Sequence, residues 1–255
     1  MKRGSFVALL ILLVLLSVVS LFIGVRNITP WGLFQASEDQ LQVFFISRVP
    51  RLIAILTAGA SMSVVGLIMQ QLARNKFVSP STAGTMESAS LGVLVATLMF
   101  SSASVLHKTA IAFVFALIGT VIFMRILEYA KYKDVIIVPL VGIMFGNVIG
   151  AFTTFLALRY DLLQSLNGWM NGDFSGILRG RYELLYIAVP LTIASYIFAD
   201  RFTLAGMGAD FATNLGLNYR FVVNLGLAII ALSSSVVVLT VGSIPYLGLI
   251  VPNVV

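Results

Sequence analysis

The 255-residue chain is 59% apolar and only 10% charged, with a mean hydropathy of +1.03. Soluble domains lie near ~45–50% apolar and ~25% charged, so these values exclude an ordinary water-soluble fold. The absence of cysteine and the single His107 exclude disulfides, thiol catalysis and Cys/His metal centres, and we expect no cofactor and no metal. The net charge of +6 indicates Lys and Arg at anionic lipid headgroups, not nucleic-acid binding.

Apolar runs alternate with polar connectors along the whole chain, and a helix needs roughly 20 residues to cross a bilayer. The sequence therefore predicts an all-α membrane protein, a polytopic helical bundle that forms one transmembrane domain over residues 1–255. The first run lacks a small-x-small cleavage site and is too long for a signal peptide, so we expect an uncleaved span. The seven predicted spans are Phe6–Val25, Leu52–Leu72, Ala89–Leu106, Thr109–Leu127, Val135–Leu158, Leu184–Ala199 and Phe221–Val241.

The positive charges suggest an orientation. With a cytoplasmic N-terminus, nine Lys and Arg residues lie in inner segments and seven in outer segments. The positive-inside rule then favours the N-terminus inside, by a small margin.

Gly142, Gly146 and Gly150 repeat at four-residue spacing in the fifth run, so they share one helix face. Two interpretations stay open. The face either packs closely against a neighbouring backbone or lines a pathway or a subunit seam.

Acidic residues bear on the source of energy. All ten, Glu87 among them, are predicted in connectors or at span ends, so no span carries a carboxylate in its middle. The chain also lacks paired carboxylates, an HExxH motif, a Ser/His/Asp set and a P-loop. We therefore expect a transporter subunit and not an enzyme, powered through another chain. Sodium coupling through backbone carbonyls stays open, because it needs no acidic residue.

Four motifs follow one another along the chain. They are Ser47–Leu52 (SRVPRL), Ala73–Pro80 (ARNKFVSP), Gly208–Gly216 (GADFATNLG) and Gly242–Pro252 (GSIPYLGLIVP). In this order they resemble the motifs of the FecCD-type permeases, the membrane subunits of ATP-binding-cassette importers for iron-siderophores, heme and cobalamin. The segment 73–86, ARNKFVSPSTAGTM, resembles the Gram-positive branch that serves catecholate siderophores such as petrobactin.

The resemblance implies a role for each motif, beside a plainer structural interpretation. Arg48 and Arg51 would lie exposed at the outer mouth and dock a substrate-binding lipoprotein, or else anchor the span to headgroups. Asn75 and Phe77 would form an inner gate, or else a helix cap and turn. Gly142, Gly146 and Gly150 would line the pathway, and Trp169–Phe174 would form an outer gate. The residues that would couple to the ATPase, or else form a surface helix, are Gly208, Asp210, Phe211, Leu215 and Gly216.

The sequence also departs from the family pattern. Lys76 stands where Pro is usual, and Asn253 stands where His is usual. The family fold has ten spans, and the chain ends inside a motif, so we expect seven spans plus a C-terminal half-helix of that fold.

The resemblance implies a complex in the bacterial plasma membrane. Its partners would be an ATPase subunit, a second identical or related permease, an outer substrate-binding lipoprotein, an iron-siderophore and membrane lipid. The alternative function is a sodium-coupled secondary transporter, and a membrane scaffold without transport activity is a third.

Overall fold

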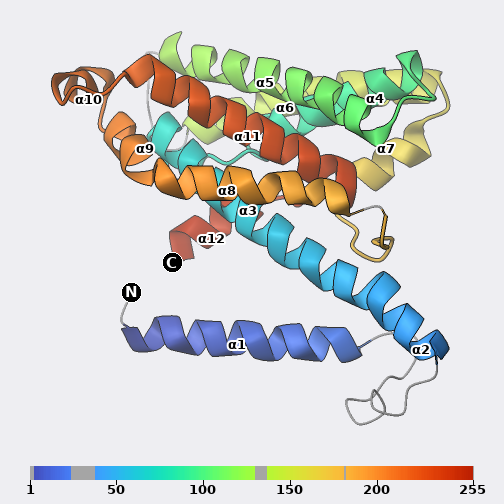
Figure 1. The fold of residues 1–255 in the computed structure, drawn as a ribbon. Helices are drawn as coiled ribbons and strands as arrows, with labels where there is room; N and C mark the ends of the chain where they lie inside the picture. The colour runs from blue at the N-terminus through green and yellow to red at the C-terminus, as the bar shows by residue number, and fades with distance from the viewer. Residues whose placement is uncertain (1–2, 24–37, 130–136, 181, 255) are drawn as a thin grey trace.

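The computed structural model describes residues 3–23, 38–129, 137–180 and 182–254, and every regular element in these ranges is helical (Figure 1). The longer helices are α1 (Arg3–Phe22), α3 (Val49–Ala73), α4 (Thr85–Met99), α5 (Val105–Tyr129), α6 (Ile137–Arg159) and α11 (Tyr219–Val241). The shorter elements are α2 (Glu38–Val43), the π-helix η2 (Phe44–Arg48), α7 (Leu163–Met170), the 3₁₀ helix η3 (Glu183–Ile187), α8 (Ala188–Ile197), α9 (Ala199–Gly206), α10 (Ala209–Asn214) and α12 (Leu247–Val254).

Helix length and composition confirm a polytopic helical membrane protein. In the described ranges, four helices are long and apolar enough to cross a bilayer, and a fifth candidate is a pair bent by 62° between α8 and α9. Shorter apolar helices cover Phe6–Phe22 and Thr85–Met99. Each of the seven predicted runs overlaps one of these elements. The four long candidates are Gln40–Ala73, Val105–Leu127, Ile137–Arg159 and Tyr219–Val241.

Two predicted boundaries are wrong. The third run was expected over Ala89–Leu106, but α4 begins at Thr85 and ends at Met99, and α5 starts at Val105. The serines between the two helices allow a turn that the apolar average concealed. The sixth run, expected over Leu184–Ala199, corresponds to η3 and α8. The chain bends by 62° where this run ends, at Phe198, whose ring lies 4.7 Å from the Arg201 guanidinium carbon.

Some sequence-based expectations lie outside the described residues. They include the ends of the first and fifth runs. They also include several charges counted for orientation, namely Lys2, Arg26, Lys131, Lys133 and Arg181.

Helix α3 runs diagonally through the bundle and packs against α8, α9, α11 and α12 (Figure 1). Gly66 of α3 lies directly against the backbone of Gly248 in α12, an approach that only residues without a side chain allow. Gln70 Nε2 also donates to the Leu249 carbonyl oxygen at 3.5 Å. The half-helix α12 is therefore fixed on the surface of α3.

Residues 74–84, between α3 and α4, are mostly buried without being helical. Non-helical backbone is tolerated at membrane depth only when protein or a cavity surrounds it. Thr82 Oγ1 accepts from the Ser79 amide at 2.9 Å and lies 3.3 Å from the Phe77 carbonyl oxygen. Gly84, with φ of +75°, then turns the chain into α4. This segment brings Phe77 and the start of α4 against α6.

Candidate functional site

Three cavities follow one face of α6, and neighbouring cavities share lining residues. The first, of about 350 Å³, has an almost wholly apolar wall that includes Phe77, Leu140 and Leu249. The second, of about 210 Å³, shares Ile143 with the first. The third measures about 220 Å³. We call the three cavities together the α6 groove. Its α6 wall consists of Pro139, Leu140, Ile143, Gly146, Asn147, Gly150, Ala151, Thr153 and Thr154.

These positions recur every three or four residues, which is the spacing of one helix face. The wall changes from apolar at Leu140 to hydroxyl- and amide-bearing at Asn147 and Thr154. The groove therefore has an apolar end and a polar end.

Of the two interpretations of the three glycines, close packing fits Gly142, and lining a cavity fits Gly146 and Gly150. A Cβ at Gly142 would overlap the carbonyl oxygen of Thr82 and lie 2.9 Å from the Phe123 ring, so this glycine serves close packing. Gly146 lines two of the cavities, and a Cβ there would lie 3.3 Å from Glu87 Oε2. Gly150 also lines the groove, with nothing within 4 Å of an added Cβ.

The predicted inner-gate pair lies at the apolar end of the groove. Arg74, with φ of +51°, ends α3, and Asn75 is only 6% exposed. Asn75 Oδ1 accepts from the Phe77 amide at 2.8 Å, which leaves the Phe77 ring 53% exposed beside the first cavity. The Asx turn predicted as the plainer interpretation is therefore present, and it is the feature that presents the ring.

The two positions that depart from the family pattern contact each other. Asn253 Nδ2 donates to the Lys76 carbonyl oxygen at 2.8 Å and to the Leu249 carbonyl oxygen at 2.8 Å. The Asn253 side chain thus ties the half-helix α12 to residues 74–77, which we call the inner-gate loop after the role predicted for Asn75 and Phe77.

Helix α10 projects from the same end of the bundle as the last turn of α3 (Figure 1). Gly208, with φ of +129°, precedes it, and Gly216, with φ of +79°, follows it. Asp210 is exposed in the first turn, where a carboxylate suits the helix dipole. Phe211 and Leu215 are 47% and 59% exposed. An exposed apolar pair on a short projecting helix offers a surface for another protein.

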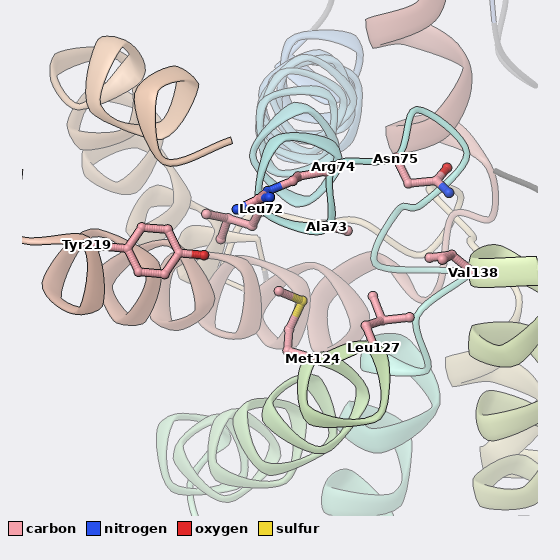
Figure 2. A pocket seen from close by; sticks show the side chains of 8 residues that line it. All are labelled: Leu72, Ala73, Arg74, Asn75, Met124, Leu127, Val138 and Tyr219. Atoms are coloured by element: carbon pink, nitrogen blue, oxygen red, sulfur yellow. The ribbon is translucent and has the colours of Figure 1, made fainter. Parts of the chain in front are cut away.

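The end of α9 and the glycine that precedes α10 lie against the end of α3. A Cβ at Gly206 would lie 2.8 Å from Gln71 Oε1, and one at Gly208 would lie 3.3 Å from Arg74 Nη2. Arg74 also lines a pocket of about 110 Å³ beside the inner-gate loop. Figure 2 shows its side chain extending toward Tyr219 of α11, with Asn75 on the other side of the pocket. The projecting helix and the inner-gate loop are therefore joined through the end of α3.

Arg48 and Arg51 lie at the opposite end of α3, and the expectation that both are exposed is wrong. Arg48 is 7% exposed, and its Nη1 donates to the Leu21 carbonyl oxygen at 2.8 Å, because the end of α1 covers it. Arg51 is half-buried, and its Nε donates to the Phe174 carbonyl oxygen at 3.1 Å. The Arg51 Nη2 donates to the Ser175 carbonyl oxygen at 3.2 Å. Both arginines thus hold the backbone of neighbouring segments.

Several residues that line the groove were not predicted, among them Glu87 and Tyr246. Glu87, placed at a span end by the sequence pattern, lies in the first turn of α4 and lines both the second and the third cavity. Tyr246 has φ of +63° and lines the first and second cavities, and its amide donates to Ser81 Oγ at 3.2 Å. The only sequence signal for Glu87 was an acidic residue next to an apolar run.

Comparison with known proteins identifies this arrangement. The profile of the FecCD transport family matches residues 10–255. The petrobactin import system permease protein YclN of Bacillus subtilis is 56% identical, over 97% of this chain and 78% of its own length. The petrobactin import system permease protein FatD of Bacillus anthracis is 42% identical, over 98% of this chain and 73% of its own.

More distant similarities agree. The ferric-anguibactin transport system permease protein FatD of Vibrio anguillarum is 37% identical over 92% of this chain and 75% of its own length. A solved structure described as an inward-facing metal-chelate type ABC transporter shares the fold, with a TM-score of 0.76 at 23% identity over 99% of this chain and 80% of its own. The resemblance drawn from the four motifs is confirmed: the chain belongs to the FecCD transport family and is a multi-pass membrane permease subunit.

Proposed function

We propose that this permease carries a ferric catecholate chelate of the petrobactin type into the cell, along the α6 groove. The observation that carries the proposal is the groove itself, which extends from the exposed Phe77 ring to the polar cavity at Glu87. The names of the two most similar relatives described above, both petrobactin import permeases, support this cargo.

The groove needs a second wall. Apolar side chains on α6, among them Leu140, Ile143 and Met144, are exposed in the single chain. A second permease, identical or related, would cover them and close a shared pathway between two α6 helices. The exposed Phe77 rings would then meet near the two-fold axis and close the inner end.

The orientation and span count extend the confirmed fold. We propose a cytoplasmic N-terminus. The start of α1 lies at the same end of the molecule as α10, the helix that we propose contacts the cytoplasmic ATPase (Figure 1). Seven crossings would be formed by α1, α3, α4, α5, α6, the bent α8 segment and α11, with α12 as the half-helix. The ten-span fold stays a prediction from the resemblance.

Energy would enter at α10. Phe211 and Leu215 would insert into the ATPase subunit. The contact between Gly208 and Arg74 would then transmit the movement of α10 to the inner-gate loop. On the outer side, Arg51 would receive a carboxylate of the binding lipoprotein, while Arg48 would keep the docking end of α3 in place.

Reconstitution tests the transport function. The permease, its ATPase and the loaded binding protein would be placed in liposomes, and uptake of ⁵⁵Fe-petrobactin would be followed. Uptake that requires ATP and the binding protein is expected. Uptake driven by a sodium gradient without any ATPase would instead favour the secondary transporter.

A further inference from the structure

Two residues that line the polar cavity of the α6 groove each carry an oxygen atom without a hydrogen-bond partner among the described residues. These atoms, Glu87 Oε2 and Ser90 Oγ, are both shielded from solvent. Ser90 is fully buried, and both residues line the third cavity. They are three positions apart on α4, so they occupy the same helix face.

Glycine on the facing helix makes room for the carboxylate. A Cβ at Gly146 would lie 3.3 Å from both Glu87 Cδ and Oε2, so any other residue there would press on this group. The carboxylate therefore lies in the contact between α4 and α6, and its residue lines both the second and the third cavity.

Two threonine hydroxyls add acceptors to this cavity, and Asn147 adds an amide group that can both accept and donate. Thr153 Oγ1 donates to the Ile149 carbonyl oxygen at 2.7 Å, and Thr154 Oγ1 donates to the Gly150 carbonyl oxygen at 2.9 Å. A hydroxyl whose proton is already donated can offer only its lone pairs to a further partner. Together with the Glu87 carboxylate, these oxygens favour a cation or a strong donor.

Charge and size narrow the ligand class. A carboxylate without a partner in a low-dielectric environment is costly, and either protonation or a bound cation offsets that cost. Within the described residues no group of three or more His, Cys, Asp or Glu could hold a metal ion, and one carboxylate suits a single positive charge. The cavity of about 220 Å³ has room for an alkali ion with water or for an ammonium group.

We propose that Glu87, Ser90 and Asn147 form a site for a singly charged cationic group on the permeation groove. The group is either a free alkali ion or an ammonium group of the transported chelate. The inference rests on the proposed transport function, and it assigns Glu87 a part in cargo selection or ion binding.

The first experiment measures ion binding without transport. The permease assembled with its ATPase in nanodiscs is titrated with ²²Na⁺, with choline chloride keeping the ionic strength constant. If the source is a free alkali ion, wild type binds ²²Na⁺ and Glu87→Gln binds it at least about tenfold more weakly, as expected for losing a charged partner. Asp161→Asn removes an exposed carboxylate at a position with φ of +56°, which Asn tolerates, and should leave binding unchanged.

The second experiment tests the cargo. Uptake of a ⁵⁵Fe catecholate chelate with a free amine is compared with uptake of the same chelate after N-acetylation. If the source is the cargo, wild type prefers the amine form and Glu87→Gln loses that preference. Ser90→Ala keeps the carboxylate and should weaken whichever effect is seen, so it replaces Glu87→Gln if that variant does not fold.

The two experiments together distinguish a free ion from a cargo group, and either of them from the absence of a cation site. A ²²Na⁺ site or an amine preference that depends on Glu87 supports the proposal and names its source. Wild type that imports both chelates equally and binds no ²²Na⁺ overturns it, and the cavity then holds water only. Failure of wild type to import any ferric chelate would count against the proposed function instead.

Discussion

Gly142 and Gly150 form a matched pair on α6, and replacing each by alanine separates packing from lining. At Gly142 the new methyl group would overlap the Thr82 carbonyl oxygen, which is backbone and cannot rotate away. At Gly150 the methyl group meets nothing within 4 Å. Both substitutions gain about 1 kcal/mol from helix propensity, but overpacking at Gly142 costs about 1–3 kcal/mol.

The difference should appear in thermal stability. Because each kcal/mol shifts Tm by about 2–4 °C for a chain of this size, Gly142→Ala should melt several degrees below Gly150→Ala. Fluorescence-detected size exclusion of heated, detergent-solubilised protein measures both. If Gly142→Ala melts together with Gly150→Ala or above it, the close contact between α6 and the buried segment 74–84 does not exist as described.

Further predictions concern the two ends of α3. Arg51→Gln should speed amide hydrogen exchange in the loop after α7, because the guanidinium no longer holds its carbonyls. The pKa of Asp173 is held below its usual range, mainly by the Ser175 hydroxyl and then by the Ser175 amide. The ionised carboxylate therefore contributes to loop order above the usual aspartate pKa, and this contribution is lost as pH falls through the depressed value. Ser175→Ala should raise the Asp173 pKa in a carboxyl NMR titration. Gly208→Ala places a side chain at φ of +129° and should lower ATPase stimulation by loaded binding protein, whereas normal stimulation would contradict the link to α3. Asn253→Ala removes the bond to the inner-gate loop and should cost about 1 kcal/mol, visible as faster exchange there.

The long helices were predictable because length and apolar content alone determine them. α3, α5, α6 and α11 each occupy a run that could hardly be anything else in a bilayer. The start of α4 was missed because it lies after a buried non-helical segment. The backbone of that segment is satisfied by side-chain hydrogen bonds inside the loop, such as those of Thr82 Oγ1, which hydrophobic periodicity does not reveal.

The site was predictable only where a motif carried it. The motif gave Phe77, and the glycine spacing gave the α6 face that the groove follows. Glu87 was missed because its burial depends on Gly146 of another helix. Arg48 was wrongly expected at the surface, because the end of α1 covers it and the motif around Arg48 does not reveal that contact.

The central claim is that solute moves along the α6 groove, and cysteine accessibility tests it directly. The chain has no cysteine, so single cysteines can be placed at Asn147, which lines two cavities, and at Val148, its 70% exposed neighbour. A thiol reacts with a membrane-impermeant methanethiosulfonate as thiolate, which requires contact with water. We predict fast modification of Asn147→Cys, slowed by loaded binding protein and ATP, and slow modification of Val148→Cys without such protection. Equal rates at both positions, or protection only at Val148→Cys, would contradict the account.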